Sequence, residues 1–181
     1  ATDTERMDSL ISEMLELSRI ESGVDPLNIE VQSVRRVVQL AINQITPQAV
    51  NSGIEIDATG VDDVSHGVDD LRLTEAITNL LSNALKASTE ESKINVTGWK
   101  ESDGSLILSV RDEGGGIEAS DLPHVFERFY KADQSRASGG SGLGLAIVRH
   151  IAEAHGGSAS VVSVPGEGAD FRISVPSEST A

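Results

Sequence analysis

The stretch SGGSGLGLAIVRHIAEAHGG, residues 138–157, places a crowd of glycines directly before a helical pattern. Its apolar residues recur at helical spacing, which predicts a helix that ends at about His155. Glycine weakens a helix, yet Gly140, Gly142 and Gly144 run at alternate positions into its start. Two explanations remain open from this segment alone. Either the glycines form a plain turn before a core helix, or their bare backbone closes around a ligand.

The sequence on either side of this stretch alternates between strand-like and helix-like patterns. Period-two alternation predicts short strands over residues 27–32, 54–60, 63–69, 93–101, 105–113, 158–164 and 169–175. Helical spacing predicts a helix over 34–51 capped by Ser33, a helix from Asp69 or Asp70 to about Ala87, and a short helical segment near 121–129. The strands are too many for a helical bundle and the helices too long for a β-sandwich. We therefore expect an α/β (α+β) two-layer sandwich, with a mixed sheet of about five strands and about three helices on one face.

A separate helix is expected at the N-terminus. Apolar residues recur there at steps of three and four: Met7, Leu10, Ile11, Met14, Leu17 and Ile20. Gly23 and Pro26 end this helix. Its apolar seam needs a partner surface, which we expect on another chain, and packing on its own domain is the alternative. The expected divisions are residues 1–24 for this helix, 25–177 for the main domain and 178–181 for a tail.

Composition limits the classes of function. The 181 residues carry 14 Lys and Arg against 29 Asp and Glu, a net charge of -15, so no nucleic-acid partner is expected. The absence of cysteine excludes disulfides and thiolate metal sites. Aromatic residues make up only 3%, so aliphatic side chains must build the core, and no apolar run is long enough for a membrane helix. Because the sequence begins with Ala1 rather than Met, we expect a fragment or a processed piece.

The segment TNLLSNALKAS, residues 78–88, carries a polar stripe on a predicted helix. Asn79, Asn83 and Lys86 share one face because they are spaced by four and three residues. Asparagine is a poor helix former, so two on one stripe suggest a polar face toward a cleft. An amide oxygen suits Mg²⁺ and a lysine suits phosphate. A solvated helix face explains the segment equally well.

The segment VRDEGGGI, residues 110–117, ends a strand with Asp112 and continues with three glycines. A carboxylate in this place can accept a hydrogen bond from an exocyclic amine. The glycines would let a flat ring lie against the backbone. A tight turn with an acidic residue is the alternative.

The segment FERFYKADQSRASGG, residues 126–140, brings Arg128, Lys131 and Arg136 into a chain that is short of cations. Small and polar residues follow, which is typical of a flap. It leads into the glycine-rich helix start, where N–H groups and the helix dipole favour an anion. A surface loop with ordinary basic residues is the alternative.

Taken together and in this order, these segments strongly resemble the catalytic ATP-binding domain of bacterial sensor histidine kinases, which has the Bergerat or GHKL fold. NLLSNALK is similar to the N box, DEGGGI to the D-x-G-x-G box, FERFYK to the F box and GSGLGLAIV to the second glycine box. RMDSLISEMLELSRIESG, residues 6–23, resembles the second helix of the dimerisation and phosphotransfer hairpin of this family. The resemblance covers roughly the whole chain.

The resemblance implies ATP and Mg²⁺ as ligands and assigns roles on the phosphate side. Asn83 would coordinate Mg²⁺ between the phosphates, with Asn79 beside it on the same face. Lys86 would contact phosphate oxygens. Arg128 and Lys131 are candidates for contact with the γ-phosphate.

The resemblance also assigns roles on the base side and in the flap. Asp112 would bind the adenine amino group, and Gly114 and Gly116 would line the base pocket. Tyr130 would pack beside the nucleotide, or else in the core. The phosphates would be wrapped by Gly140, Ser141, Gly142, Leu143 and Gly144. Apolar contacts would anchor the flap through Phe126 and Phe129.

The phosphoacceptor histidine of this family lies in a His-Glu/Asp-x-Arg-like box on the first hairpin helix. None of the histidines here has that context: His66, His124, His150 and His155. The resemblance therefore implies a chain that binds ATP but cannot complete autophosphorylation alone. Its partners would be the hairpin helix with the acceptor histidine, a second copy in a homodimer, and a response regulator. The domain would be cytoplasmic, in a full-length protein anchored in the bacterial inner membrane.

ATP hydrolases such as gyrase and Hsp90 share the fold that the resemblance implies. In them a glutamate four residues before the magnesium asparagine activates water. That position is Asn79 here and Glu75 lies one turn further back, so we expect little ATPase activity. The alternatives to a histidine kinase are an anti-sigma-type serine kinase and a nucleotide-sensing interaction module. The N-terminal helix and FERFY disfavour the first, and the intact metal and phosphate candidates disfavour the second.

Overall fold

The computed structural model describes residues 26–131 and 141–177. Along these residues the elements are β1 (Glu30–Ser33), α2 (Val34–Asn51), β2 (Glu55–Val61), β3 (Ser65–Val68), α3 (Asp70–Ala87), β4 (Lys93–Lys100), β5 (Leu106–Arg111), the 3-10 helix η1 (Leu122–His124), α4 (Gly144–Ala154), β6 (Ser158–Ser163) and β7 (Ala169–Val175). The predicted N-terminal helix, the boundary at residue 24 and the tail 178–181 lie outside the described residues.

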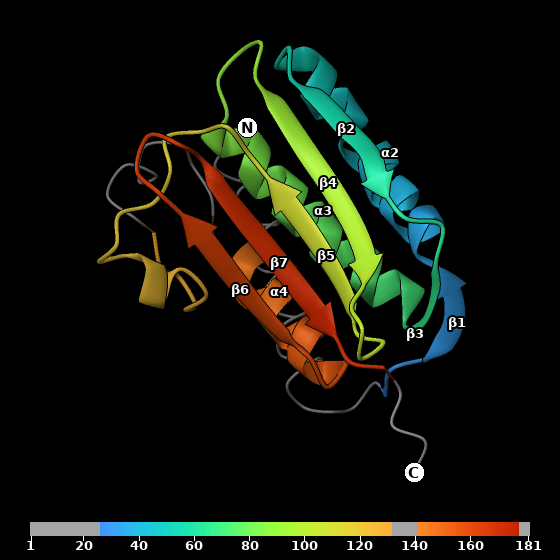
Figure 1. The fold of residues 1–181 in the computed structure, drawn as a ribbon. Coiled ribbons are helices and arrows are strands. Elements are labelled where there is room, and N and C mark those ends of the chain that lie inside the picture. The colour runs from blue at the N-terminus through green and yellow to red at the C-terminus, as the bar shows by residue number, and fades with distance from the viewer. Residues whose placement is uncertain (1–25, 132–140, 178–181) are drawn as a thin grey trace, which may run out of the picture.

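Five strands form one mixed sheet in the order β2-β4-β5-β7-β6. The β2–β4 pair is parallel and the other neighbours are antiparallel. Helices α2, α3 and α4 lie together on one face of this sheet (Figure 1). The predicted two-layer sandwich is therefore confirmed. The strands β1 and β3 pair with each other in a separate two-stranded sheet, so they form as predicted without extending the main sheet.

The core between the two layers is almost entirely aliphatic, as the scarcity of aromatic residues predicts. Strand β4 turns Ile94 and Val96 inward, and the intervening residues remain partly exposed, which is the period of a strand covered on one face. The helices meet them with fully buried side chains such as Leu80 and Ile147. Each such side chain stabilises the fold by about 1.5–3 kcal/mol on burial.

Both long helices begin where the sequence predicts, because a side chain caps each of them. The Ser33 hydroxyl accepts a hydrogen bond from the Arg36 N–H (3.4 Å) at the start of α2. The Asp69 Oδ1 accepts one from the Arg72 N–H (3.0 Å) at the start of α3. These side chains satisfy backbone donors that have no partner inside the helix, which fixes the first turn.

Asp69 also joins three separate parts of the domain. Its Oδ2 accepts a hydrogen bond from the Asn28 N–H (2.9 Å), and its own N–H donates to His155 Nε2 (3.1 Å) at the end of α4. The other ring nitrogen, Nδ1, lies 2.8 Å from Ile151 O. A carbonyl only accepts and an N–H only donates, so His155 is a neutral imidazole with its proton on Nδ1. This histidine is therefore occupied in holding the start of α3 to the end of α4.

The helical segment predicted near residues 121–129 is shorter than expected, since only η1 forms there. Pro123 lies in the first turn of η1, where its missing N–H costs no helical hydrogen bond, so it does not end the helix. Phe129 has a φ of 61°, a left-handed conformation that no helix accommodates. Successive turns replace the helix, with hydrogen bonds from the Glu127 N–H to His124 O (2.8 Å) and from the Tyr130 N–H to Glu127 O (3.3 Å).

Candidate functional site

The polar stripe of α3 forms as predicted. Asn79 and Asn83 are half-buried and Lys86 is exposed, while the apolar residues between them are buried in the core. Asn79 Nδ2 donates to Glu75 O one turn earlier (3.2 Å). The side chain of Asn83 makes no hydrogen bond within the described residues, so its amide oxygen is available to a ligand. The Glu75 carboxylate, one turn before Asn79, lies 3.4 Å from Arg72 Nη1.

Asp112 is the most deeply buried polar residue of the site, with 1% of its surface exposed. It directly follows β5, and its N–H donates to Ala169 O (2.9 Å) on β7. Its Oδ1 accepts from the Gly114 N–H (2.9 Å), whereas its buried Oδ2 has no hydrogen-bond partner in the described part of the chain. Burial raises the pKa of this carboxyl, against the lowering effect of its backbone hydrogen bonds. A buried acceptor without a donor is costly, so it fits a ligand that brings an N–H.

The glycines after Asp112 bring the loop against other backbone segments. A Cβ atom on Gly114 would collide with Ala87 O at the end of α3, and one on Gly116 would collide with Val164 O after β6. Gly116 also has a φ of 72°, which favours glycine. The sequence analysis assigned both to contact with a flat ring. The structure adds a different reason for them, which is close packing of the loop on the protein itself.

The glycine-rich start of α4 lies against the polar stripe of α3. A Cβ atom on Gly144 would lie 3.1 Å from Asn79 Oδ1. Gly142 has a φ of 75°, and a Cβ atom on it would lie 2.8 Å from the backbone of Phe129. The Ser141 hydroxyl accepts from the Leu143 N–H (3.1 Å), and the Leu143 side chain is fully buried. Leu143 can therefore offer a ligand only its backbone. The predicted Gly140 lies outside the described residues.

The aromatic residues of the predicted flap behave differently from one another. Phe126 packs edge to face on Phe171 of the core, with ring centroids 6.2 Å apart, as expected of an anchor. The same prediction is wrong for Phe129, whose side chain is 56% exposed. Phe129 instead uses its backbone, since its N–H donates to Gly142 O (2.9 Å). Its left-handed φ turns the chain there and directs the ring outward.

Arg128, Tyr130 and Lys131 are close to Phe129 in the chain. The Tyr130 hydroxyl donates to Asp121 Oδ1 (2.7 Å), and its ring lies 5.5 Å from the ring of His124. Arg128 is exposed and Lys131 is half-buried. The structure therefore brings together the polar stripe of α3, the start of α4 and the described part of the flap, residues 126–131. Within the described residues, neither Arg128 nor Lys131 is hydrogen-bonded to the stripe.

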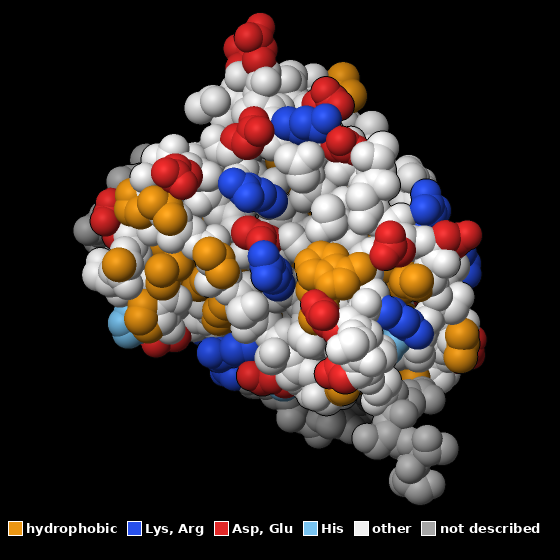
Figure 2. Space-filling model, in the orientation of Figure 1, with side chains coloured by type: hydrophobic (Ala, Val, Ile, Leu, Met, Phe, Trp, Pro, Cys, Tyr) orange, Lys and Arg blue, Asp and Glu red, His pale blue; other side chains and the backbone are white. Residues whose placement is uncertain are grey.

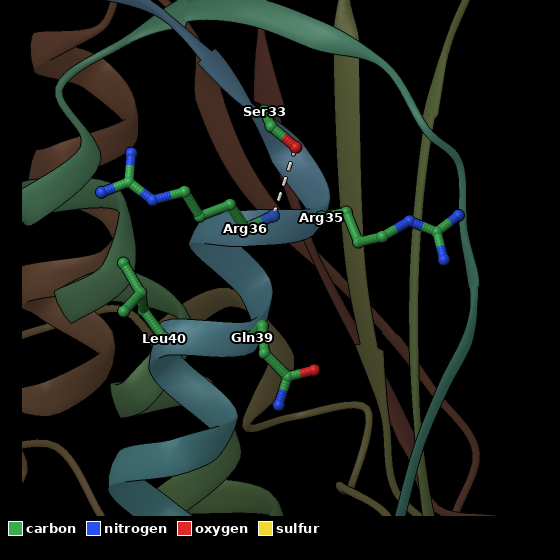
Figure 3. A pocket seen from close by; sticks show the side chains of 5 residues that line it. All are labelled: Ser33, Arg35, Arg36, Gln39 and Leu40. Atoms are coloured by element: carbon green, nitrogen blue, oxygen red, sulfur yellow. Dashed lines mark hydrogen bonds between the residues drawn. The ribbon is translucent and has the colours of Figure 1, made fainter.

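Two other surfaces lie apart from this group. A shallow hollow at the start of α2 is lined by Ser33, the predicted cap of that helix, and by Arg35, Arg36, Gln39 and Leu40, for which the sequence predicted no role (Figure 3). Arg35 and Arg36 point in opposite directions there, and Arg35 NH2 donates to Val61 O (2.8 Å). This hollow has no titratable acid and no orphaned polar atom among its lining residues, so it does not compete with Asp112 as a site.

The open face of the sheet intersperses acidic and basic side chains (Figure 2). Arg172 pairs with Asp170 (2.6 Å) and Lys93 with Asp57 (3.0 Å). The hydroxyl and N–H of Thr59, followed by Lys93, hold the pKa of the Asp57 carboxyl far below its usual range. On this face, Arg172 and Lys93 are thus each paired with a neighbouring carboxylate.

Comparison with known proteins identifies the family. Residues 68–179, a span that includes Asp112, the polar stripe and the start of α4, match the model of the histidine kinase-, DNA gyrase B- and HSP90-like ATPases. The chain belongs to this family. The sensor-like histidine kinase SenX3 of Mycolicibacterium smegmatis is 36% identical over 176 residues, which cover 96% of this chain and 46% of that protein. The chain thus spans about half of the length of this relative.

Solved structures agree with the family match. Full-length ShkA in complex with AMPPNP superposes with a TM-score of 0.81 at 27% identity, covering 96% of this chain and 36% of that one. The mycobacterial sensor histidine kinase MprB superposes with a TM-score of 0.75 at 30% identity, covering 82% of this chain and 98% of that one. The predicted relationship to histidine kinase catalytic domains is therefore confirmed. No helix in the described ranges is long and apolar enough to cross a membrane.

The hairpin of β6 and β7 forms as the sequence predicts, but the contact of its turn with Asp112 was not predicted. A Cβ atom on Gly168 would collide with Asp112 O, and Gly166 and Gly168 have φ values of 84° and 81°. The run PGEG, residues 165–168, signals a turn in the sequence. It does not signal that the turn contacts Asp112, because that contact joins residues far apart in the chain.

Proposed function

We propose that this chain is the ATP-binding catalytic domain of a sensor histidine kinase, and that it transfers the γ-phosphate of ATP to a histidine outside residues 1–181. The buried, unpartnered Oδ2 of Asp112 carries the proposal, since it lies beside the loop that packs on the end of α3. The AMPPNP complex of ShkA, a protein of the same fold, supports a nucleotide ligand. The similarity to SenX3 and MprB favours a kinase over the other activities of the fold.

In this proposal the chain divides nucleotide binding between two groups of residues. Asp112 Oδ2 accepts the hydrogen bond of the adenine amine and so fixes the base. Asn83, whose amide has no other engagement in the described residues, holds the magnesium ion, and Asn79 supports the start of α4. Lys86 contacts phosphate oxygens. Mg²⁺, when bound, supplies charge neutralisation for phosphoryl transfer.

The contacts of the histidines in this chain also favour a phosphoacceptor histidine outside residues 1–181. Three of the histidines already have partners: His66 Nε2 lies 3.0 Å from Pro176 O, His124 Nδ1 lies 2.7 Å from Glu127 Oε1, and His155 holds Asp69. A neutral histidine is a good nucleophile, so this domain needs no strong base and its task is positioning. We further propose that the whole protein acts as a homodimer, is membrane-anchored and passes phosphate to a response regulator.

The test mixes this chain with Mg-ATP and a separate helical hairpin that carries an acceptor histidine. Acid-labile, alkali-stable phosphate should appear on the hairpin, and should be absent when the acceptor is replaced by glutamine. ATP hydrolysis in the absence of the hairpin should stay low, because Asn79 occupies the position of a water-activating glutamate. ATP binding without any transfer, across several hairpins of related kinases, would contradict the kinase assignment while leaving the nucleotide site intact.

A further inference from the structure

The turn between β6 and β7 is held to the loop after Asp112 by several hydrogen bonds, and one serine side chain takes part in two of them. The Ser163 hydroxyl donates to Gly168 O (2.6 Å) and accepts from the Ile117 N–H (2.9 Å). Close by, the Gly166 N–H donates to Gly115 O (2.7 Å). Ser163 thus bridges two backbone groups that are 51 residues apart in the chain.

The packing around this bridge leaves little room for movement. A Cβ atom on Gly168 would collide with Asp112 O, and one on Gly116 would collide with Val164 O. The Asp112 N–H is bonded to Ala169 O (2.9 Å). The turn therefore forms the floor on which the loop 112–117 rests.

The orientation of the Asp112 carboxylate depends on this loop. Its Oδ1 is held by the Gly114 N–H (2.9 Å), so the direction of Oδ2 follows from the position of Gly114. The loop is fixed at its start by the hydrogen bond from Asp112 to Ala169, in its middle by the hydrogen bond from Gly166 to Gly115, and at its end by the hydrogen bond from Ile117 to Ser163. Removing the last of these would loosen the end of the loop, and with it the position of Gly114 and of the carboxylate.

We propose that Ser163 is a positioning residue for the base pocket. Its hydroxyl holds the loop 112–117 against the β6–β7 turn and so keeps Asp112 Oδ2 directed toward the exocyclic amine of the base. The proposal rests on the proposed function, since it takes Asp112 as the group that binds adenine. It predicts an effect on recognition of the base that is separate from contact with the phosphates.

The experiment compares ATP, inosine triphosphate and tripolyphosphate on the full chain, each with Mg²⁺. Inosine triphosphate lacks the exocyclic amine, and tripolyphosphate lacks the base. Ser163→Ala should weaken ATP binding roughly three- to tenfold, the effect of one or two lost hydrogen bonds. It should reduce the preference for ATP over inosine triphosphate by the same factor and leave tripolyphosphate binding unchanged. Ser163→Thr keeps the hydroxyl and should restore ATP binding and the preference.

The matched control is Ser160→Ala, which removes an exposed hydroxyl from the same strand and should change none of the three affinities. Equal weakening of ATP and tripolyphosphate by Ser163→Ala, or an unchanged ATP preference, would overturn the positioning role. So would failure of Ser163→Thr to restore the preference, which keeps the test decisive if the alanine variant folds poorly. A parent chain that binds ATP and inosine triphosphate equally would instead refute the assignment of Asp112, and this inference would fail with it.

Discussion

The two ends of the site are built in different ways. At the base end, Asp112 is buried, and its loop is fixed by backbone hydrogen bonds and by glycines that allow close packing. At the proposed phosphate end, Asn79 and Asn83 are half-buried and Lys86 is exposed. In the proposed function, the base end is therefore preorganised to recognise one shape, whereas the phosphate end relies on more exposed groups and on charge.

This difference separates specificity from affinity. A rigid, water-poor pocket makes one hydrogen bond highly selective, because the wrong partner leaves a buried group unpaired. An exposed lysine gives a weaker and salt-dependent contact. Substitution of Asp112 should therefore change the selectivity for the base, whereas substitution of Lys86 should change the affinity in a way that depends on salt.

The largest effect is expected from Asn83→Ala. Loss of the amide oxygen should lower Mg-ATP affinity on the order of a hundredfold, at the upper end of what loss of a group supporting a metal costs. Binding measured with and without Mg²⁺ should become equal, and the thermal melt should change little. Calorimetric titration checks the first result and a melting curve the second. Asn43→Ala, on the exposed face of α2, is the matched control. A variant that keeps its response to Mg²⁺ would remove Asn83 from the metal site.

A smaller loss of affinity and a gain in stability are expected together from Asp112→Asn. The amide can present a donor to the adenine amine, so ATP should bind roughly tenfold more weakly or worse, the effect of one lost hydrogen bond to a charged group. Competition between ATP and inosine triphosphate, for the parent chain and for the variant, measures this loss of affinity.

The stability effect should depend on pH. Burial raises the folded-state pKa of Asp112, so its contribution to stability is present at low pH and is lost as the pH rises through that pKa. The ionised parent should therefore melt at a lower temperature than Asp112→Asn at pH 7. The difference should shrink toward pH 4. Melting curves of both proteins across this range test it, and parallel curves at a constant separation would contradict the assigned pKa direction.

The smallest effect is expected from Lys86→Ala. The side chain is exposed, so ATP affinity should fall only about threefold at low salt, a modest effect of the size of surface charge contacts. The loss should disappear as ionic strength rises toward the molar range. Lys100→Ala, on an exposed position at the end of β4, controls for net charge. An equal response of the two variants would mean that Lys86 acts only through overall charge.

The sequence predicts well what is decided locally. Ser33 and Asp69 cap helices at the predicted places because an N-cap acts over three residues. The strands follow from period-two alternation, and the stripe of α3 from its helical period. The features that the sequence did not predict are set by backbone conformation or by contacts between residues that are far apart in the chain. Phe129 was expected to anchor the flap in apolar contacts, but it has a left-handed φ of 61° and is exposed.

The glycines also show that local patterns do not predict contacts between distant segments. The sequence shows how many glycines follow Asp112. Their partners, Ala87 O and Val164 O, are supplied by packing between segments that no local pattern connects. Ser163 stayed unnoticed for this reason, since a serine at the end of a strand carries no signal of its own.

The contacts of Asp69 converge on one residue. The Asn28 N–H donates to the same carboxylate that caps α3, and the Asp69 N–H donates to His155 at the end of α4. Asn83 lies fourteen residues further along α3, or about 21 Å at the rise of an α-helix. The chain at residue 28 and the end of α4 are therefore anchored to the first turn of the helix that carries Asn83.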